Sequence, residues 1–133
     1  MRVAELMTTD VVSIESDATV AEAVGRLADE HISALAVTTT NGLFVGVLST
    51  SDILQAEAST QDSEARDMLF ERTLVAEIMT REPLTIEPEA EAREAAQQML
   101  YADVHRLFVT SQGKLVGVIS QSDLVRALAH GRV

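Results

Sequence analysis

The sequence predicts a mixed α/β (α+β) fold in which two β-α-β-β-α repeats pack about a pseudo-twofold axis into one module. One observation is the length, because 133 residues suit a single compact domain. The other is an internal duplication, which pairs residues 3–8 with 75–80, 35–38 with 107–110, and 45–52 with 116–123. Neither copy is long enough to bury both faces of a three-stranded sheet alone. The copies are therefore expected to share one core and to form clefts where they meet.

Each copy begins with a short strand and a helix. The strands are predicted at residues 11–14 and 84–86, which are rich in β-branched and aliphatic side chains. Thr19 and Glu22 resemble a capping box at the start of the first helix. The apolar residues at the helical spacing i, i+4 and i+7 are Val20, Val24 and Leu27 in the first copy and Ala92, Ala96 and Met99 in the second.

A hairpin and a second helix complete each copy. Two apolar runs flank Asn41-Gly42 in the first copy and Gln112-Gly113 in the second, and such dipeptides are typical of hairpin turns. In both copies a Ser-x-x-Asp sequence then precedes a short apolar run, which predicts a short helix.

The copies are joined by a segment of different composition. The repeats are assigned to residues 1–57 and 75–133. Residues 58–74 are polar at first and then helix-like, so we expect a loop that leads into a linking helix. The apolar contacts of that helix are expected to come from Met68, Leu69 and Leu74.

The composition disfavours several classes of function. Twenty-one acidic residues against ten basic ones give a net charge of −11, which disfavours binding to nucleic acid or to a membrane surface. The chain has no cysteine and only three scattered histidines, so no disulfide, metal or other cofactor is expected. No apolar run approaches the roughly 18–20 residues that span a bilayer, and the N-terminus lacks the apolar core of a signal peptide. These features predict a cytoplasmic protein.

A repeated motif, Gly-h-h-Ser-x-Ser-Asp with h hydrophobic, lies at residues 46–52 and 117–123. A glycine within a strand often marks the close approach of backbone or ligand. Ser49 and Ser120 each end a strand just before a helix, where a hydroxyl can reach a phosphate beside free N–H groups. Asp52 and Asp123 can each accept two hydrogen bonds from a ribose diol. The alternative is a helix capping box, and the spacing alone favours that interpretation.

The copies differ at the start of one strand. Ile32-Ser33-Ala34 in the first copy becomes Val104-His105-Arg106 in the second. Arginine suits the forked recognition of phosphate oxygens, and a nearby imidazole can also donate. The alternative is a solvated strand end at which Arg106 pairs with a local acid such as Asp103.

No catalytic arrangement is recognisable. Asp52 and Asp123 are a conceivable carboxylate pair, but no nucleophile, base and orienting group occur together. Ser49 and Ser120 lack a Gly-x-Ser-x-Gly elbow, and no GxGxxG loop is present. The chain is therefore not expected to be an enzyme.

Nearly the whole chain resembles a tandem pair of CBS domains, the Bateman module. The resemblance rests on the Met7-Thr8 and Met79-Thr80 pairs, on the strands that begin with Ser33 and His105, and on the repeated Gly-h-h-Ser-x-x-Asp. It implies the β-α-β-β-α pair, a disc-like homodimer, and a regulatory role. In that role the module binds an adenosine-containing ligand and passes the signal to a partner protein.

The resemblance also implies two ligand sites, each with residues from both repeats. The first would contain Ser49, Asp52, Leu84, Ala90, Ala95, Val104, His105 and Arg106. The second would contain Val11, Val12, Ala18, Ala23, Ile32, Ser33, Ser120 and Asp123. Aspartates are expected to bind ribose, the serines with His105 and Arg106 to bind phosphate, and apolar residues to hold adenine.

The sequence departs from the family's strongest phosphate sites. Such members often carry Lys or Arg between the hydroxyl and the aspartate, where this chain has Thr50-Ser51 and Gln121-Ser122. We therefore expect AMP rather than a triphosphate, with ADP, ATP, NAD or S-adenosylmethionine as the other ligands to test. Asp52 is expected at the better site, because the strand that partners Asp123 offers only Ser33. The rival interpretation is a ligand-free scaffold that dimerises.

Overall fold

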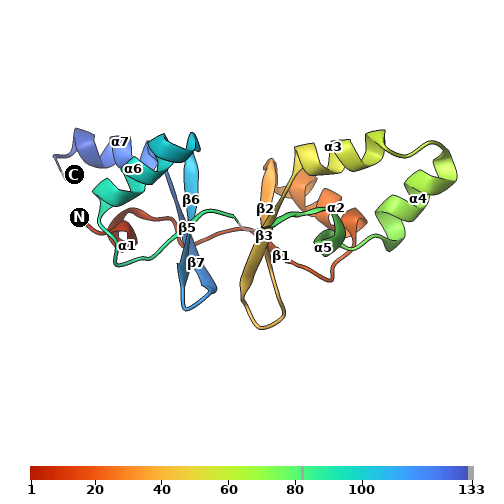
Figure 1. The fold of residues 1–133 in the computed structure, drawn as a ribbon, viewed down its shortest axis with the longest axis horizontal. Helices are drawn as coiled ribbons and strands as arrows, with labels where there is room; N and C mark the ends of the chain where they lie inside the picture. Colours follow the sequence, from red (N-terminus) through yellow and green to blue (C-terminus); the bar gives the residue numbers. More distant parts are fainter. Residues whose placement is uncertain (82, 132–133) are drawn as a thin grey trace. The chain divides into compact units, whose positions relative to one another are not determined.

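The computed structural model describes residues 1–81 and 83–131, which fall into two compact units (Figure 1). Unit 2 is the continuous segment Val12–Pro83. Unit 1 combines Met1–Val11 with the chain from Leu84 onward. Each unit has its own sheet and helices, and the predicted mixed α/β fold with two repeats is confirmed.

Unit 2 contains a four-stranded sheet in the order β1-β2-β3-β4. Strand β1 is parallel to β2, and β3 is antiparallel to both β2 and β4. The elements are β1 (Ser13–Glu15), α2 (Val20–Glu30), β2 (Ala34–Thr38), β3 (Phe44–Ser49), α3 (Thr50–Ala58), α4 (Ser63–Arg72), α5 (Val75–Ile78) and β4 (Thr80–Arg81).

Unit 1 contains a three-stranded sheet in the order β5-β6-β7. Strand β5 is parallel to β6, and β6 forms an antiparallel hairpin with β7. The elements are α1 (Val3–Leu6), β5 (Thr85–Ile86), α6 (Ala92–Ala102), β6 (Arg106–Ser111), β7 (Lys114–Ser120) and α7 (Gln121–Ala129).

Local sequence explains where α2 and the hairpins begin and end. The Thr19 hydroxyl accepts a hydrogen bond from the Glu22 amide at 3.2 Å, which satisfies one of the free N–H groups at the start of α2. The helix ends at His31, which adopts the left-handed conformation. Gly42 and Gly113 have φ angles of 87° and 80°, so both predicted hairpin turns use the backbone freedom of glycine.

The leading segments of the two repeats, residues 1–8 and 73–80, are exchanged between the units. Helix α1 packs in unit 1, where the Val3 amide donates to the Ala90 carbonyl at 2.8 Å and Val3 is fully buried. Helix α5 packs in unit 2, where the Val75 amide donates to the Ala18 carbonyl at 2.8 Å. Each unit therefore combines the sheet of one repeat with the leading segment of the other.

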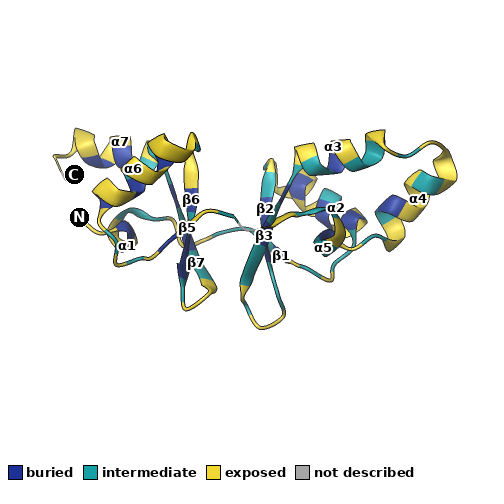
Figure 2. Cartoon of the chain, in the orientation of Figure 1, coloured by how far each residue is buried: buried dark blue, intermediate teal, exposed yellow. Residues whose placement is uncertain are grey.

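Among the described residues, buried apolar side chains form one cluster in each unit. The single core shared by the two copies stays a prediction. Figure 2 shows that buried residues lie along the strands and alternate with exposed ones on the helices. The exchange of the leading segments completes both clusters, because Val3 belongs to the cluster of unit 1 and Val75 to that of unit 2. Each sheet gains a cover that its own repeat does not supply.

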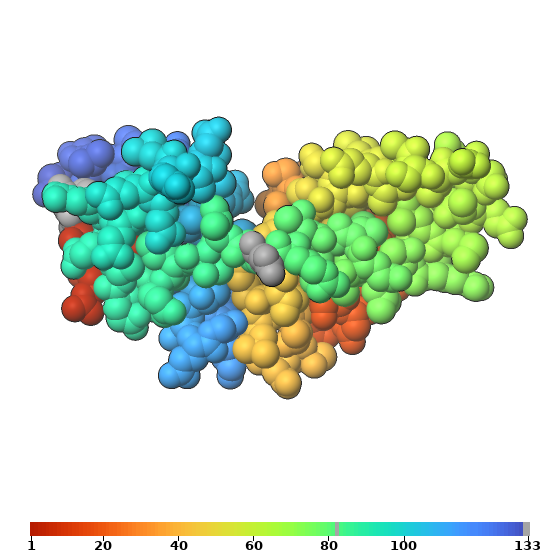
Figure 3. Space-filling model, in the orientation of Figure 1, coloured from red at the N-terminus to blue at the C-terminus, as the bar shows by residue number. Residues whose placement is uncertain are grey.

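Helix α4 follows only the first repeat and lies on the surface of unit 2, where it packs against α2 (Figure 3). Its start is capped by Asp62, whose carboxylate accepts from the Ala65 amide at 2.8 Å. Of the three apolar residues expected to anchor the linking helix, Leu69 is buried whereas Met68 and Leu74 are exposed. A single buried leucine with Phe70 beside it therefore attaches this helix.

Candidate ligand site

Both Ser-x-x-Asp sequences form capping boxes. In α3 the Ser49 amide donates to Asp52 Oδ2 at 2.9 Å, and the Asp52 amide donates to Ser49 Oγ at 3.1 Å. In α7 the corresponding bonds between Ser120 and Asp123 are 2.9 and 3.2 Å long. The capping interpretation is confirmed in both copies, and it fixes each carboxylate while leaving Oδ1 outside the box.

The glycines of the motif are explained by the leading segments. A Cβ atom on Gly46 would lie 2.7 Å from the Thr80 carbonyl oxygen and 2.8 Å from the Met79 sulfur. A Cβ atom on Gly117 would lie 2.9 Å from the Thr8 carbonyl oxygen and 2.7 Å from the sulfur of Met7. The repeated glycine and the repeated Met-Thr pair are therefore two sides of one contact, and the close approach is of protein backbone.

Thr80 adds a contact that the sequence did not reveal. It lies on β4 opposite Val47 of β3, and its hydroxyl donates to Asp52 Oδ1 at 3.2 Å. A weaker contact reaches Oδ2 at 3.4 Å. The only sequence signal was its place in the repeated Met-Thr pair, which does not say what the hydroxyl faces.

Asp123 has a different partner. Its Oδ1 accepts from the Arg126 guanidinium at 3.3 Å, one turn along α7. The Asp123 side chain is 11% exposed, whereas that of Arg126 is 68% exposed. Both aspartates thus form the same kind of cap, but Asp52 faces a neutral hydroxyl and Asp123 faces a cation.

His105 and Arg106 lie beside the cap of α7. The Gln121 amide donates to the His105 carbonyl at 2.9 Å, and Arg106 is the register partner of Ser120. Both side chains are exposed. The alternative pairing of Arg106 with Asp103 is not formed, and Asp103 instead ends α6 in the left-handed conformation.

In unit 2 the residues that correspond to His105 and Arg106 carry no charge. The Thr50 amide donates to the Ser33 carbonyl at 2.9 Å, and Ala34 is the register partner of Ser49. Ser33 and its neighbour Ile32 therefore lie beside the cap of Ser49 in unit 2, and His105 lies beside the cap of Ser120 in unit 1. The sequence-based sites combined residues of both units, and that assignment stays a prediction.

The remaining predicted site residues differ in burial. Ala23 and Ala95 are fully buried members of the hydrophobic clusters, so their side chains serve the cores. Leu84 is exposed, and its carbonyl accepts from the Phe108 amide at 3.4 Å. The partly buried ones are Val11, Val12, Ala18, Ala90 and Val104.

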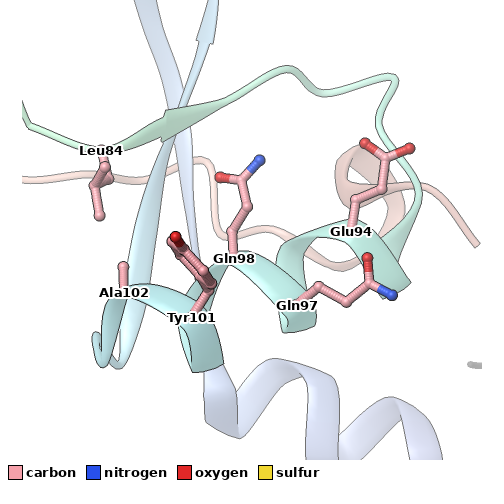
Figure 4. A pocket seen from close by; sticks show the side chains of 6 residues that line it. All are labelled: Leu84, Glu94, Gln97, Gln98, Tyr101 and Ala102. Carbon is pink, nitrogen blue, oxygen red and sulfur yellow. The ribbon is translucent and has the colours of Figure 1, made fainter.

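A depression of about 500 Å³ lies in unit 1 beside the C-terminal half of α6 (Figure 4). Leu84 faces Tyr101 across it, so one wall is aliphatic and the other aromatic. Its lining residues are Leu84, Glu94, Gln97, Gln98, Tyr101 and Ala102. Sequence reasoning identified Leu84 and missed the residues of α6, because polar side chains on an exposed helix face carry no pattern of their own.

Comparison with known proteins decides the family. A sequence model of the CBS domain matches residues 3–59 and 75–130. The chain belongs to the CBS-domain family. It carries the domain twice, as the resemblance in sequence predicted.

CBS-pair proteins are also similar to the chain over most of its length. It is 28% identical over 123 residues to the CBS domain-containing protein YhcV of Bacillus subtilis, covering 92% of this chain and 81% of that protein. A crystal structure of CBSX2 in complex with AMP superposes with a TM-score of 0.79 at 25% identity, covering 99% of this chain and 98% of that one. An inosine-5'-monophosphate dehydrogenase of Korarchaeum cryptofilum is 29% identical, but the match spans only 23% of that enzyme.

Within residues 1–81 and 83–131, none of the helices has the length and apolar character needed to cross a membrane.

Proposed function

We propose that this CBS pair is a regulatory module of the cytoplasm that binds an adenosine-containing ligand, AMP first among them, and modulates a partner protein. The observation that carries the proposal is the pair of aspartates held by capping boxes at the ends of β3 and β7. A carboxylate fixed by its own helix can accept both hydroxyls of a ribose without first being ordered. AMP in the crystal of the similar protein CBSX2 supports this ligand class.

The acidity of the chain is compatible with an anionic ligand of small size. A net charge of −11 repels a polyanion along its whole length, whereas a monophosphate meets only the local field. At the α7 end that local field includes Arg106 and Arg126, and His105 can add a donor. The expected partners are therefore a nucleotide and an effector protein, with neither nucleic acid nor membrane, and no catalytic step is assigned.

Calorimetric titration with AMP tests the proposal. We expect Asp52→Asn and Asp123→Asn each to weaken binding at its own end by about 10- to 100-fold, since a hydrogen bond to a charged group contributes about 1.5–3 kcal/mol. Asparagine keeps an acceptor for the cap, so folding is retained. Asp67→Asn on the exposed surface of α4 removes the same charge away from both motifs and is the matched control. Equal affinities in all four proteins would refute the proposal.

One observation favours a second candidate, the dimerising scaffold. Helices α6 and α7 pack side by side and expose several large apolar side chains. These are Leu100 (77% exposed), Tyr101 (96%), Val125 (63%) and Leu128 (59%). Large exposed apolar side chains on two adjacent helices are typical of a surface that another protein covers, and we propose a second copy of the chain.

Two measurements separate the candidates. A ligand that binds only the folded protein raises its melting temperature, so the regulatory module predicts a shift with AMP, ADP, ATP, NAD or S-adenosylmethionine. The scaffold predicts no shift at millimolar ligand. In both cases Leu128→Glu is expected to convert a dimer to monomers in analytical ultracentrifugation. Because Leu128 is exposed in the single chain, the monomer should keep its fold, which circular dichroism would show.

A further inference from the structure

The two copies of the Ser-Asp cap differ in the group that occupies the free carboxylate oxygen. At Asp52 that group is the Thr80 hydroxyl, 3.2 Å from Oδ1. At Asp123 it is the Arg126 guanidinium, 3.3 Å from Oδ1. The residue that follows Asp52 by the same three positions is Gln55, which is exposed and neutral. Arg126 therefore places a positive charge beside Asp123, whereas no side chain at the corresponding position places one beside Asp52.

The surroundings of α7 reinforce this difference. Arg106 and His105 lie at the start of β6 beside the cap, where unit 2 has Ala34 and Ser33. The sheet of unit 2 carries a cation at Arg81 on β4, but its guanidinium donates to the Ala76 carbonyl at 3.1 Å. In a chain with twice as many acids as bases, this end of unit 1 therefore has two arginines, Arg106 and Arg126, close to one cap.

The two occupants have different consequences for a ligand hydroxyl that approaches Oδ1. Thr80 is neutral and its hydroxyl rotates, so a ribose can replace it by an equivalent hydrogen bond. Arg126 makes a charge-assisted bond, and a neutral ligand that displaces it leaves the guanidinium without its anion. A ligand that carries a phosphate returns an anion to Arg126, whose five donors can serve phosphate and carboxylate together.

We propose that Arg126 makes the α7 end selective for anionic adenosine ligands, while the α3 end accepts neutral ones as readily. This inference rests on the proposed adenosine site. It also amends the ranking from sequence, in which Asp52 had the better site because His105 and Arg106 were assigned to it and only Ser33 to Asp123. No basic residue lies between the serine and the aspartate in either copy, but Arg126 supplies one three residues after Asp123.

The test compares AMP with adenosine, which differ only in the phosphate. Asp52→Asn isolates the α7 end, and the ratio of the two dissociation constants is measured by calorimetry with and without Arg126→Gln, which copies the residue at position 55. We expect the preference for AMP to fall about tenfold, the effect of losing one charge-assisted hydrogen bond. Arg126→Lys keeps the charge and should retain part of the preference. Conversely, Gln55→Arg combined with Asp123→Asn should create such a preference at the α3 end.

The outcomes distinguish this inference from the function on which it rests. If the wild type binds neither AMP nor adenosine, both are overturned. If AMP binds but Arg126→Gln leaves the ratio unchanged, or if Asp52→Asn abolishes all binding, only the role of Arg126 is wrong. Melting temperatures accompany each titration, and we expect Arg126→Gln to change stability little because the ion pair is exposed on the arginine side.

Discussion

Replacing Gly46 by alanine is the sharpest test of how the leading segments dock. The added Cβ would lie 2.7 Å from the Thr80 carbonyl oxygen and 2.8 Å from the Met79 sulfur. The thioether can move, but the carbonyl belongs to β4, which is paired with β3 at this position. The strand must therefore shift, and overpacking of this kind costs about 1–3 kcal/mol.

The expected result is a clear loss of stability. With about 2–5 °C lost per kcal/mol for a chain of this size, Gly46→Ala should lower the melting temperature by roughly 2–15 °C. Gly117→Ala should behave similarly, because its Cβ would meet the Met7 sulfur and the Thr8 carbonyl oxygen. Circular dichroism melts and urea titrations provide the measurement.

Gly25 is the matched control. It lies within α2, and a Cβ there would meet nothing within 4 Å. Alanine is the better helix former by about 0.5–1 kcal/mol, so Gly25→Ala should raise stability. If Gly46→Ala is as harmless as Gly25→Ala, the docking of β4 on Gly46 is wrong. If Met79→Ala fully rescues Gly46→Ala, the sulfur rather than the backbone sets the cost.

Three further results are expected. Ser49→Ala and Ser120→Ala should each cost about 1 kcal/mol in urea unfolding through loss of the cap, and a neutral result would contradict the capping boxes. Thr80→Val should cost up to about 1 kcal/mol by removing the bond to Asp52, and the matched Thr8→Val should cost less; the opposite order would be inconsistent with the structure. Finally, the net charge of −11 predicts that molar salt raises the melting temperature by screening self-repulsion, and an unchanged value would count against adaptation of this acidic surface to salt.

Duplication and local chemistry made the elements predictable from the sequence. The helix spacing around Val20 and Leu27, the glycine turns and the Ser-Asp caps are set by neighbours in the chain, so each appears where expected. The exchange of leading segments was not predictable. Met7 and Met79 stand in nearly identical sequence contexts, and so do Gly46 and Gly117, so the sequence does not say which methionine meets which glycine.

Only part of the candidate site could be predicted, because the sequence shows repeated motifs but not the contacts that folding creates. The aspartates and serines were visible as a repeated motif, whereas Thr80 and Arg126 act through contacts formed across strands or one turn along a helix. Ala95, predicted from sequence to line the ligand site, is fully buried in the cluster of unit 1, because an alanine near a motif can equally well be a core residue.

The exchange also orders the events of synthesis. Unit 2 is continuous from Val12 to Pro83, so all of its strands have left the ribosome before translation ends. Unit 1 pairs its first residues with its last, since Thr8 bonds to Val118 across more than a hundred positions. The N-terminal segment therefore cannot complete its contacts before residues 88–92 and strand β7 have been made, because the Val3 amide bonds to the Ala90 carbonyl and Thr8 to Val118. Pairing over so many positions slows folding, so unit 2 is expected to fold before unit 1.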